Sequence, residues 1–135
     1  MGQTKELCVK AAAAFVAATA ARLLGGADVW LYTLVAFTLA DYVSGTAKAA
    51  LTGKLSSRGA FAGGLRKILV YVVVGLAAAL DNLLPGGALL RNLTVGYYIA
   101  EEGLSVIENL GACGVRYPKK FGAALAALKS DDEKR

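Results

Sequence analysis

Long apolar stretches, separated by short polar or glycine-containing segments, dominate this sequence. A helix that crosses the hydrocarbon core of a bilayer takes about 20 residues. Four stretches approach or reach that length, and they run over about 9–24, 29–51, 68–84 and 89–112. The pattern predicts an all-α, small polytopic membrane protein with four transmembrane helices. Because four crossings and their connections use nearly all of the 135 residues, we expect a single membrane domain over 1–135.

The first stretch is the weakest of the four. It is short and rich in alanine, which contributes little to membrane insertion. If this stretch instead lies on the membrane surface, three crossings remain, and a cleavable signal peptide is a further alternative.

A short helix is expected over about 117–129, after the last apolar stretch. Pro118 suits a first helical turn. We expect an amphipathic helix that lies in the cytoplasmic interface of the membrane, with a frayed tail as the alternative. The apolar side chains that recur along it at helical spacing are Tyr117, Phe121, Ala124, Leu125 and Leu128.

Composition agrees with a membrane protein and narrows the chemistry. Hydrophobic residues make up 56% of the chain and the mean hydropathy is +0.52, while 19% of residues are charged, against about 25% in soluble domains. The chain has no His and only two, widely spaced, Cys residues. This removes the usual zinc and haem ligands and a His-dependent nucleophile. We therefore expect neither an enzyme nor a bound metal or cofactor.

The net charge of +5 comes from basic residues that lie mainly at the start of the chain, where Lys5 and Lys10 precede the first apolar stretch, and between and after the other stretches. Under the positive-inside rule, this places both termini and the 52–67 loop on the cytoplasmic side of a bacterial inner membrane. No basic stretch has the interleaved aromatic residues of strand-binding proteins, so nucleic acid is not an expected partner. The cations of the predicted cytoplasmic basic loop are Lys48, Lys54, Arg58, Arg66 and Lys67.

Several acidic residues lie inside the apolar stretches. Asp41, Glu101 and Glu102 fall near the middle of theirs, where a charge costs about 2.5–3.5 kcal/mol on insertion scales, and no cation is expected at that depth. Such groups are either protonated or face a polar cavity. Asp41 is the candidate intramembrane acid. Near the outer end, Asp81 and Arg91 flank a tight hairpin, and we expect them to form an ion pair.

The fourth stretch carries a nearly continuous polar face. At helical spacing it presents Arg91, Thr94, Tyr98, Glu101, Glu102, Ser105, Glu108 and Asn109. This polar stripe belongs either to the core of a self-contained four-helix bundle or to the wall of an oligomeric pore. Small residues, which let membrane helices approach closely, form a candidate packing face: Gly45, Gly75, Gly96, Ala100 and Gly103.

Four segments in this order resemble the toxin secretion and phage lysis holins. They are DYVSG at 41–45, LSSRGAFAGGLRK at 55–67, LD at 80–81 and YIAEEGLSVIENLGACG at 98–114, followed by Pro118. The most specific part is the Glu-x-x-Ser-x-x-Glu-Asn run of the last segment. The family pattern has an Asn-Glu pair where this chain has Glu-Glu at 101–102, which leaves the role of Glu101 open.

The resemblance implies a holin, which oligomerises in the cytoplasmic membrane and forms lesions that release an endolysin or a toxin. The implied partners are other copies of the chain, the lipid bilayer, and endolysin as a functional partner. The size of the chain agrees with an oligomer, because one four-helix monomer cannot enclose a channel wide enough for a folded enzyme. The alternatives are a small four-helix proton-coupled multidrug exporter, which uses a membrane Glu, and a plain membrane anchor.

Overall fold

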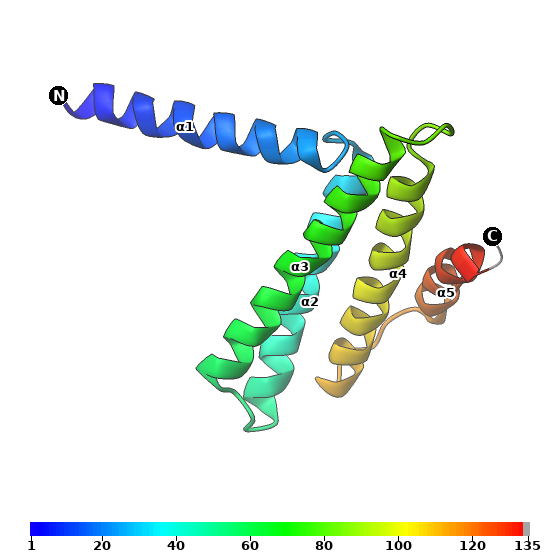
Figure 1. Ribbon diagram of the computed structural model, residues 1–135. Coiled ribbons are helices and arrows are strands. Elements are labelled where there is room, and N and C mark those ends of the chain that lie inside the picture. Colours follow the sequence, from blue (N-terminus) through cyan, green and yellow to red (C-terminus); the bar gives the residue numbers. More distant parts are fainter. Residues whose placement is uncertain (134–135) are drawn as a thin grey trace.

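The computed structural model describes the backbone of residues 1–133 and the side chains of residues 1–128 (Figure 1). Within this part of the chain there are five helices and no strand, which confirms the all-α class. The second and fourth helices have the predicted bounds. The helices are α1 (Gly2–Leu23), α2 (Val29–Leu51), α3 (Ser57–Asp81), α4 (Leu89–Ala112) and α5 (Lys119–Glu133).

Three of the helices, α2, α3 and α4, lie side by side as a bundle, and α4 contacts α2, α3 and α5 (Figure 1). The α2–α3 loop and the end of α4 lie at one end of the bundle, and the α1–α2 turn and the α3–α4 loop lie at the other. A small apolar core joins the three helices, and it consists of Leu34, Val74, Val95 and Ile99.

Helix α1 projects away from the bundle (Figure 1). It begins at Gly2, well before the predicted start near residue 9, because its polar first turns are also helical and include an exposed ion pair between Glu6 and Lys10. Every residue of this fully described helix is at least partly exposed. Only its last turn meets α3, where a Cβ on Gly75 would lie 3.8 Å from the backbone oxygen of Leu23.

Helix α3 begins at Ser57 rather than at the predicted residue 68, and it ends at Asp81 rather than at 84. The side chain of Ser56 caps its first turn by accepting a hydrogen bond of 3.1 Å from the backbone N–H of Gly59. The apolar run marks only the later part of the helix, whereas the cap determines where it starts. The predicted extent of the basic loop is therefore wrong. Of its cations only Lys54 lies in the loop, because Lys48 ends α2 and Arg58, Arg66 and Lys67 lie in α3.

Helix α5 packs against α4. It begins at Lys119, and the carbonyl of Pro118 accepts the backbone N–H of Phe121 at 3.0 Å. The side chain of Leu125 lies so close to Gly103 that a Cβ there would be 2.7 Å from it. The amphipathic helix expected at the membrane interface is thus docked on its own bundle.

Beside its apolar core the bundle buries polar and charged side chains, and its outside is largely apolar. The buried polar positions are Thr38, Asp41, Ser44, Arg91, Glu102 and Asn109, while large apolar side chains such as Leu39, Val43, Leu69, Val72 and Leu76 are exposed. Each buried side-chain nitrogen and oxygen of the described residues has a hydrogen-bond partner. Buried charges under an exposed apolar surface are unusual in a water-soluble protein and suit a lipid environment.

By length and composition, one helix of the described chain, α3, is long and apolar enough to cross a membrane. The four crossings predicted from the sequence are therefore not confirmed.

Candidate functional site

A cluster of buried charges joins α2, α3 and α4 near the middle of the bundle. The ammonium group of Lys67 forms ion pairs with Asp41 Oδ2 and Glu102 Oε2. The side chains of Asp41 and Glu102 are 10% and 7% exposed. One ammonium group on α3 therefore bridges carboxylates on the two neighbouring helices. We call these residues, with Asn109 and Ser44, the Lys67 cluster.

Amide and hydroxyl groups complete the Lys67 cluster. The side-chain amide of Asn109 donates to Asp41 Oδ1 at 3.0 Å and to Ser44 Oγ at 3.2 Å. The hydroxyl of Ser44 donates to the backbone oxygen of Asp41 at 3.2 Å. Towards the apolar core, the hydroxyl of Tyr71 donates to Thr38 Oγ1 at 3.0 Å. The three helices are thus joined by directional polar contacts as well as by apolar packing.

The position of Lys67 corrects the prediction that no cation lies at the depth of Asp41 and Glu102. That prediction followed from starting the third helix at residue 68, which left Lys67 in a loop. The sequence feature that indicates the true start of this helix is the pair Ser56-Ser57, because a serine before a helical run is a common N-cap. A helix that starts there carries Lys67 three turns inwards.

The polar stripe predicted on α4 is divided between different environments. Arg91, Glu102 and Asn109 are buried. They are separated by eleven and seven residues, close to whole helical turns, and so share one face of α4. Glu108 is exposed, and the remaining members, Thr94, Tyr98, Glu101 and Ser105, are half-buried.

The small residues predicted to form one packing face instead make separate contacts within the chain. A Cβ on Gly45 would lie 3.5 Å from Asn109 Nδ2, and one on Gly96 would lie 3.4 Å from the ring of Trp30. Gly75 and Gly103 meet α1 and α5, as described above, and Ala100 is fully buried. These small residues let the helices of one chain approach each other.

The buried guanidinium of Arg91 fixes the turn between α1 and α2. It is 2% exposed, and it donates to the backbone oxygens of Leu24 and Gly26, each at 3.0 Å. It also forms an ion pair with Asp28. Asp28 in turn caps α2 by accepting the N–H of Leu31 at 2.9 Å. The hydrogen bonds from Arg91 hold the pKa of Asp28 below its ordinary value of 3.8, although partial burial opposes the shift.

The ion pair expected between Asp81 and Arg91 is wrong, because the Arg91 side chain pairs with Asp28 instead. The carboxylate of Asp81 accepts the backbone N–H groups of Leu90 and Arg91, at 3.0 and 2.7 Å. Free N–H groups and the helix dipole make the first turn of α4 a favourable place for a carboxylate. Asp81 and Arg91 do lie together at the hairpin, but Asp81 contacts the backbone of Arg91 and not its guanidinium.

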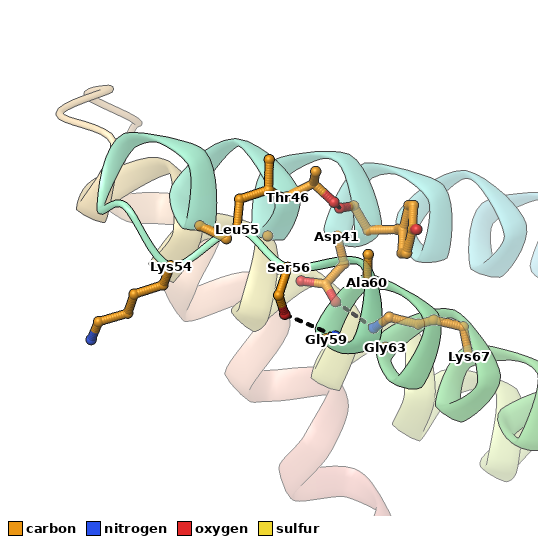
Figure 2. Close-up of a pocket in the computed structure, with 12 residues that line it drawn as sticks. Asp41, Thr46, Lys54, Leu55, Ser56, Gly59, Ala60, Gly63 and Lys67 are labelled. Atoms are coloured by element: carbon orange, nitrogen blue, oxygen red, sulfur yellow. Dashed lines mark hydrogen bonds and ion pairs between the residues drawn. The ribbon is translucent and has the colours of Figure 1, made fainter.

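A cleft between α2 and α3 leads to the Lys67 cluster (Figure 2). Its volume is about 190 Å³. Asp41 and Lys67 line it together with residues of the α2–α3 loop, and in Figure 2 the side chain of Lys54 points away from them. We call this feature the α2–α3 cleft. The described residues contain no group of His, Cys, Asp and Glu side chains arranged to hold a metal ion.

Comparison with known proteins gives one family match and several similar chains. Residues 18–130 match the bacteriophage holin family. The chain is 35% identical to a probable holin of Bacillus phage phi105 over 106 residues, which are 78% of each chain. It is 33% identical to an uncharacterized protein of Halalkalibacterium halodurans over 134 residues, covering 96% of this chain and 99% of that one. An uncharacterized 14.9 kDa protein of Clostridium perfringens is 37% identical over 109 residues, or 80% and 83% of the two chains. No solved structure matches.

Proposed function

Because the chain belongs to the bacteriophage holin family, whose members are non-enzymatic proteins that permeabilise membranes, we propose that it self-associates in the bacterial cytoplasmic membrane and opens lesions. Through these lesions an endolysin, or in some hosts a toxin, leaves the cell. The endolysin is a functional partner that need not touch the chain. The direct partners are the lipid bilayer and further copies of the same chain.

The observation that carries this proposal is the exposed apolar surface of α2, α3 and α4 together with the charged and polar side chains that they bury. The exposed apolar surface requires a lipid environment, and the satisfied polar interior requires that the three helices stay together in it. We propose that these three helices cross the membrane as one unit. The family match over 18–130 supports a single membrane domain.

The distribution of cations supports an orientation for this bundle. Lys48, Lys54, Arg58 and Arg116 lie at or near the end that holds the α2–α3 loop and the end of α4. The cations at the opposite end are Arg22 and Arg91, and Arg91 is neutralised by Asp28. The positive-inside rule then places the α2–α3 loop and the C-terminal segment in the cytoplasm.

A lesion that passes a folded enzyme needs many copies of a bundle this small. We propose that the helices of each copy separate and that their polar inner faces then line the lesion. The wall would include Asp41, Ser44 and Lys67 on α2 and α3 as well as the polar stripe of α4. In the closed bundle Lys67 holds these faces together.

Substitution of Glu102 tests this role. Glu102→Gln and Glu102→Ala weaken the bridge between α3 and α4, so we expect lysis to start earlier after induction than with the wild-type chain. The readout is culture turbidity together with release of a cytoplasmic enzyme, in cells that also express an endolysin. Glu108→Gln, at an exposed position of the same helix, is the matched control.

Unchanged lysis timing for both Glu102 variants, at equal amounts of protein in the membrane, would contradict a lesion role for the buried face. Resistance to a cationic drug without abrupt lysis would instead identify the chain as an exporter.

A further inference from the structure

The α2–α3 cleft exists because small residues face each other across it. Gly45 and Ala49 lie on the α2 side, and Gly59, Ala60 and Gly63 lie on the α3 side. A Cβ on Gly63 would meet nothing within 4 Å. The cleft is therefore open space that larger side chains would fill.

The cleft offers what ordered water requires. Its volume of about 190 Å³ is several times the roughly 30 Å³ that one water molecule occupies in the liquid. Thr46 and Ser56 bring hydroxyl groups to its lining, and Asp41 and Lys67 bring charged groups. Water molecules in the cleft would thus have polar partners along its length.

Water in the cleft would stabilise the charged side chains at its inner end. When ionised, Asp41 and Glu102 contribute two negative charges and Lys67 contributes one positive charge, so the three sum to one negative charge. Tyr71 on α3 is a further titratable side chain near them, and its hydroxyl is bonded to Thr38, while Tyr42 and Lys54 line the cleft together with Asp41 and Lys67. An uncompensated charge away from water is strongly unfavourable, and water or a small cation in the cleft reduces that cost.

Beyond the cluster the bundle is closed. On each of the three helices the apolar core follows about two turns further on, at Leu34, Val74 and Val95. These three side chains have no exposed surface. Water that enters at the α2–α3 loop therefore meets a dry, apolar layer before the opposite end.

We propose that the α2–α3 cleft is an aqueous access route, open on the α2–α3 loop side of the membrane only, which brings water and small cations to the Lys67 cluster. The proposal rests on the insertion of α2, α3 and α4 proposed above. The ligand class follows from the negative charge that the cluster carries when both carboxylates are ionised and from the small-residue walls, which together favour water and small cations over anions and larger solutes.

Thiol accessibility tests this proposal. In a chain with Cys8→Ser and Cys113→Ser, single cysteines are introduced by Gly63→Cys, which faces the cleft, and by Ala62→Cys, its exposed neighbour at the same depth. Sealed vesicles of each orientation are treated with a cationic, membrane-impermeant methanethiosulfonate. Lys54→Cys and Leu83→Cys mark the two ends of α3.

We expect Gly63→Cys to react only from the side on which Lys54→Cys reacts. Because apolar surroundings suppress the thiolate and each pKa unit of suppression lowers its amount tenfold, Gly63→Cys should react about tenfold or more faster than Ala62→Cys. An anionic reagent of the same size should react more slowly than the cationic one. Adding Ala60→Leu, which fills the mouth of the cleft, should slow the reaction at Gly63→Cys and leave that at Lys54→Cys unchanged.

Equal rates at Gly63→Cys and Ala62→Cys, or reaction of Gly63→Cys from both sides, would overturn the access route. Thr46→Cys on the opposite wall is a second reporter, so the result does not depend on the folding of one variant. If Lys54→Cys and Leu83→Cys react from the same side, α3 does not cross the membrane. That outcome would overturn the proposed insertion itself, and it is distinguishable from a cleft that is dry.

Discussion

Lys67 and Arg91 are two buried or partly buried cations with different surroundings. Lys67 lies between two carboxylates of different helices, so its removal would leave both of them buried without their cation. Breaking a buried ion pair from one side costs about 3–5 kcal/mol. Arg91 instead combines one carboxylate with two backbone carbonyls of a turn. Lys67 therefore joins helices, whereas Arg91 fixes the direction in which the chain leaves α1.

The interaction of Arg91 with Asp28 predicts a specific pH dependence. Since the pKa of Asp28 is lowered in the folded chain, this carboxylate stabilises the fold above its ordinary pKa of 3.8, and the contribution is lost as the pH falls through the lowered value. Asp28→Asn should lower the free energy of unfolding at neutral pH by about 1 kcal/mol or less, because the side chain is 44% exposed. The measurement is thermal unfolding in detergent micelles.

Below pH 3.8 the difference between the wild-type chain and Asp28→Asn should shrink. Glu6→Gln, on the exposed part of α1, is the control and should show no such difference. A gap between wild type and Asp28→Asn that stays constant from neutral to acidic pH would show that the Arg91 contact does not depend on the charge of Asp28.

At the scale of helices, the contact of α5 with α4 depends on the missing side chain of Gly103. Leucine at this position would place atoms where both methyl groups of Leu125 and the ring of Phe37 now lie. Overpacking of this kind costs about 1–3 kcal/mol, which is enough to release a short helix. We expect Gly103→Leu to release α5 and so loosen the exposed segment 113–118 before it, measured as faster cleavage by trypsin at Arg116 in detergent micelles.

The second substitution Leu125→Ala removes the nearer of the two clashing side chains and should partly restore slow cleavage. Gly122→Ala, whose Cβ would lie 3.6 Å from Ile107, is the matched control on α5. Equal cleavage rates for Gly103→Leu and the wild-type chain would mean that α5 is not held on α4 by this contact.

Helices bounded by turn-forming residues could be predicted from the sequence. The bounds of α2 and α4 follow from Gly25-Gly26 before α2, Thr52-Gly53 after it and Pro85-Gly86-Gly87 before α4. The start of α3 could not be found from hydropathy, because polar and glycine residues fill its first three turns. The docking of α5 on Gly103 is a contact between distant parts of the chain, and helical spacing alone does not reveal it.

The residues of the candidate site also divide into those that could be predicted from the sequence and those that could not. Asp41 and Glu102 stand out in the sequence because acids are rare in apolar stretches, and both lie in the Lys67 cluster. Their partner Lys67 was missed because its place depends on the start of α3. The partner of Arg91 was missed because Asp28 lies in a turn more than sixty residues earlier in the chain.

For the whole molecule, if α2, α3 and α4 cross the membrane as proposed, the number of crossings depends on α1. We expect the N-terminus in the cytoplasm, and hence four crossings, because Lys5 and Lys10 would otherwise lie on the wrong side. In the structure α1 points away from the bundle, so a fourth crossing requires the turn at Gly25 and Gly26 to reorient. The measurement is labelling of Thr4→Cys from each side of sealed vesicles, in the cysteine-free chain.

Thr4→Cys should react from the same side as Lys54→Cys and from the side opposite Leu83→Cys. Reaction of Thr4→Cys together with Leu83→Cys would instead establish three crossings, with α1 along the outer surface of the membrane.

The charged interior of the bundle has a consequence for the growth of a lesion. Two opposite charges 4 Å apart attract each other by about 1 kcal/mol in water but by about 4 kcal/mol at an effective dielectric constant of 20. In the proposed lesion, a copy at the rim would meet water on one flank, so its Lys67 cluster would hold the helices less tightly than in a copy enclosed by lipid. Each opened copy would thereby loosen its neighbours. Nucleation of the first hole would then be the slow event, and widening would proceed along the rim.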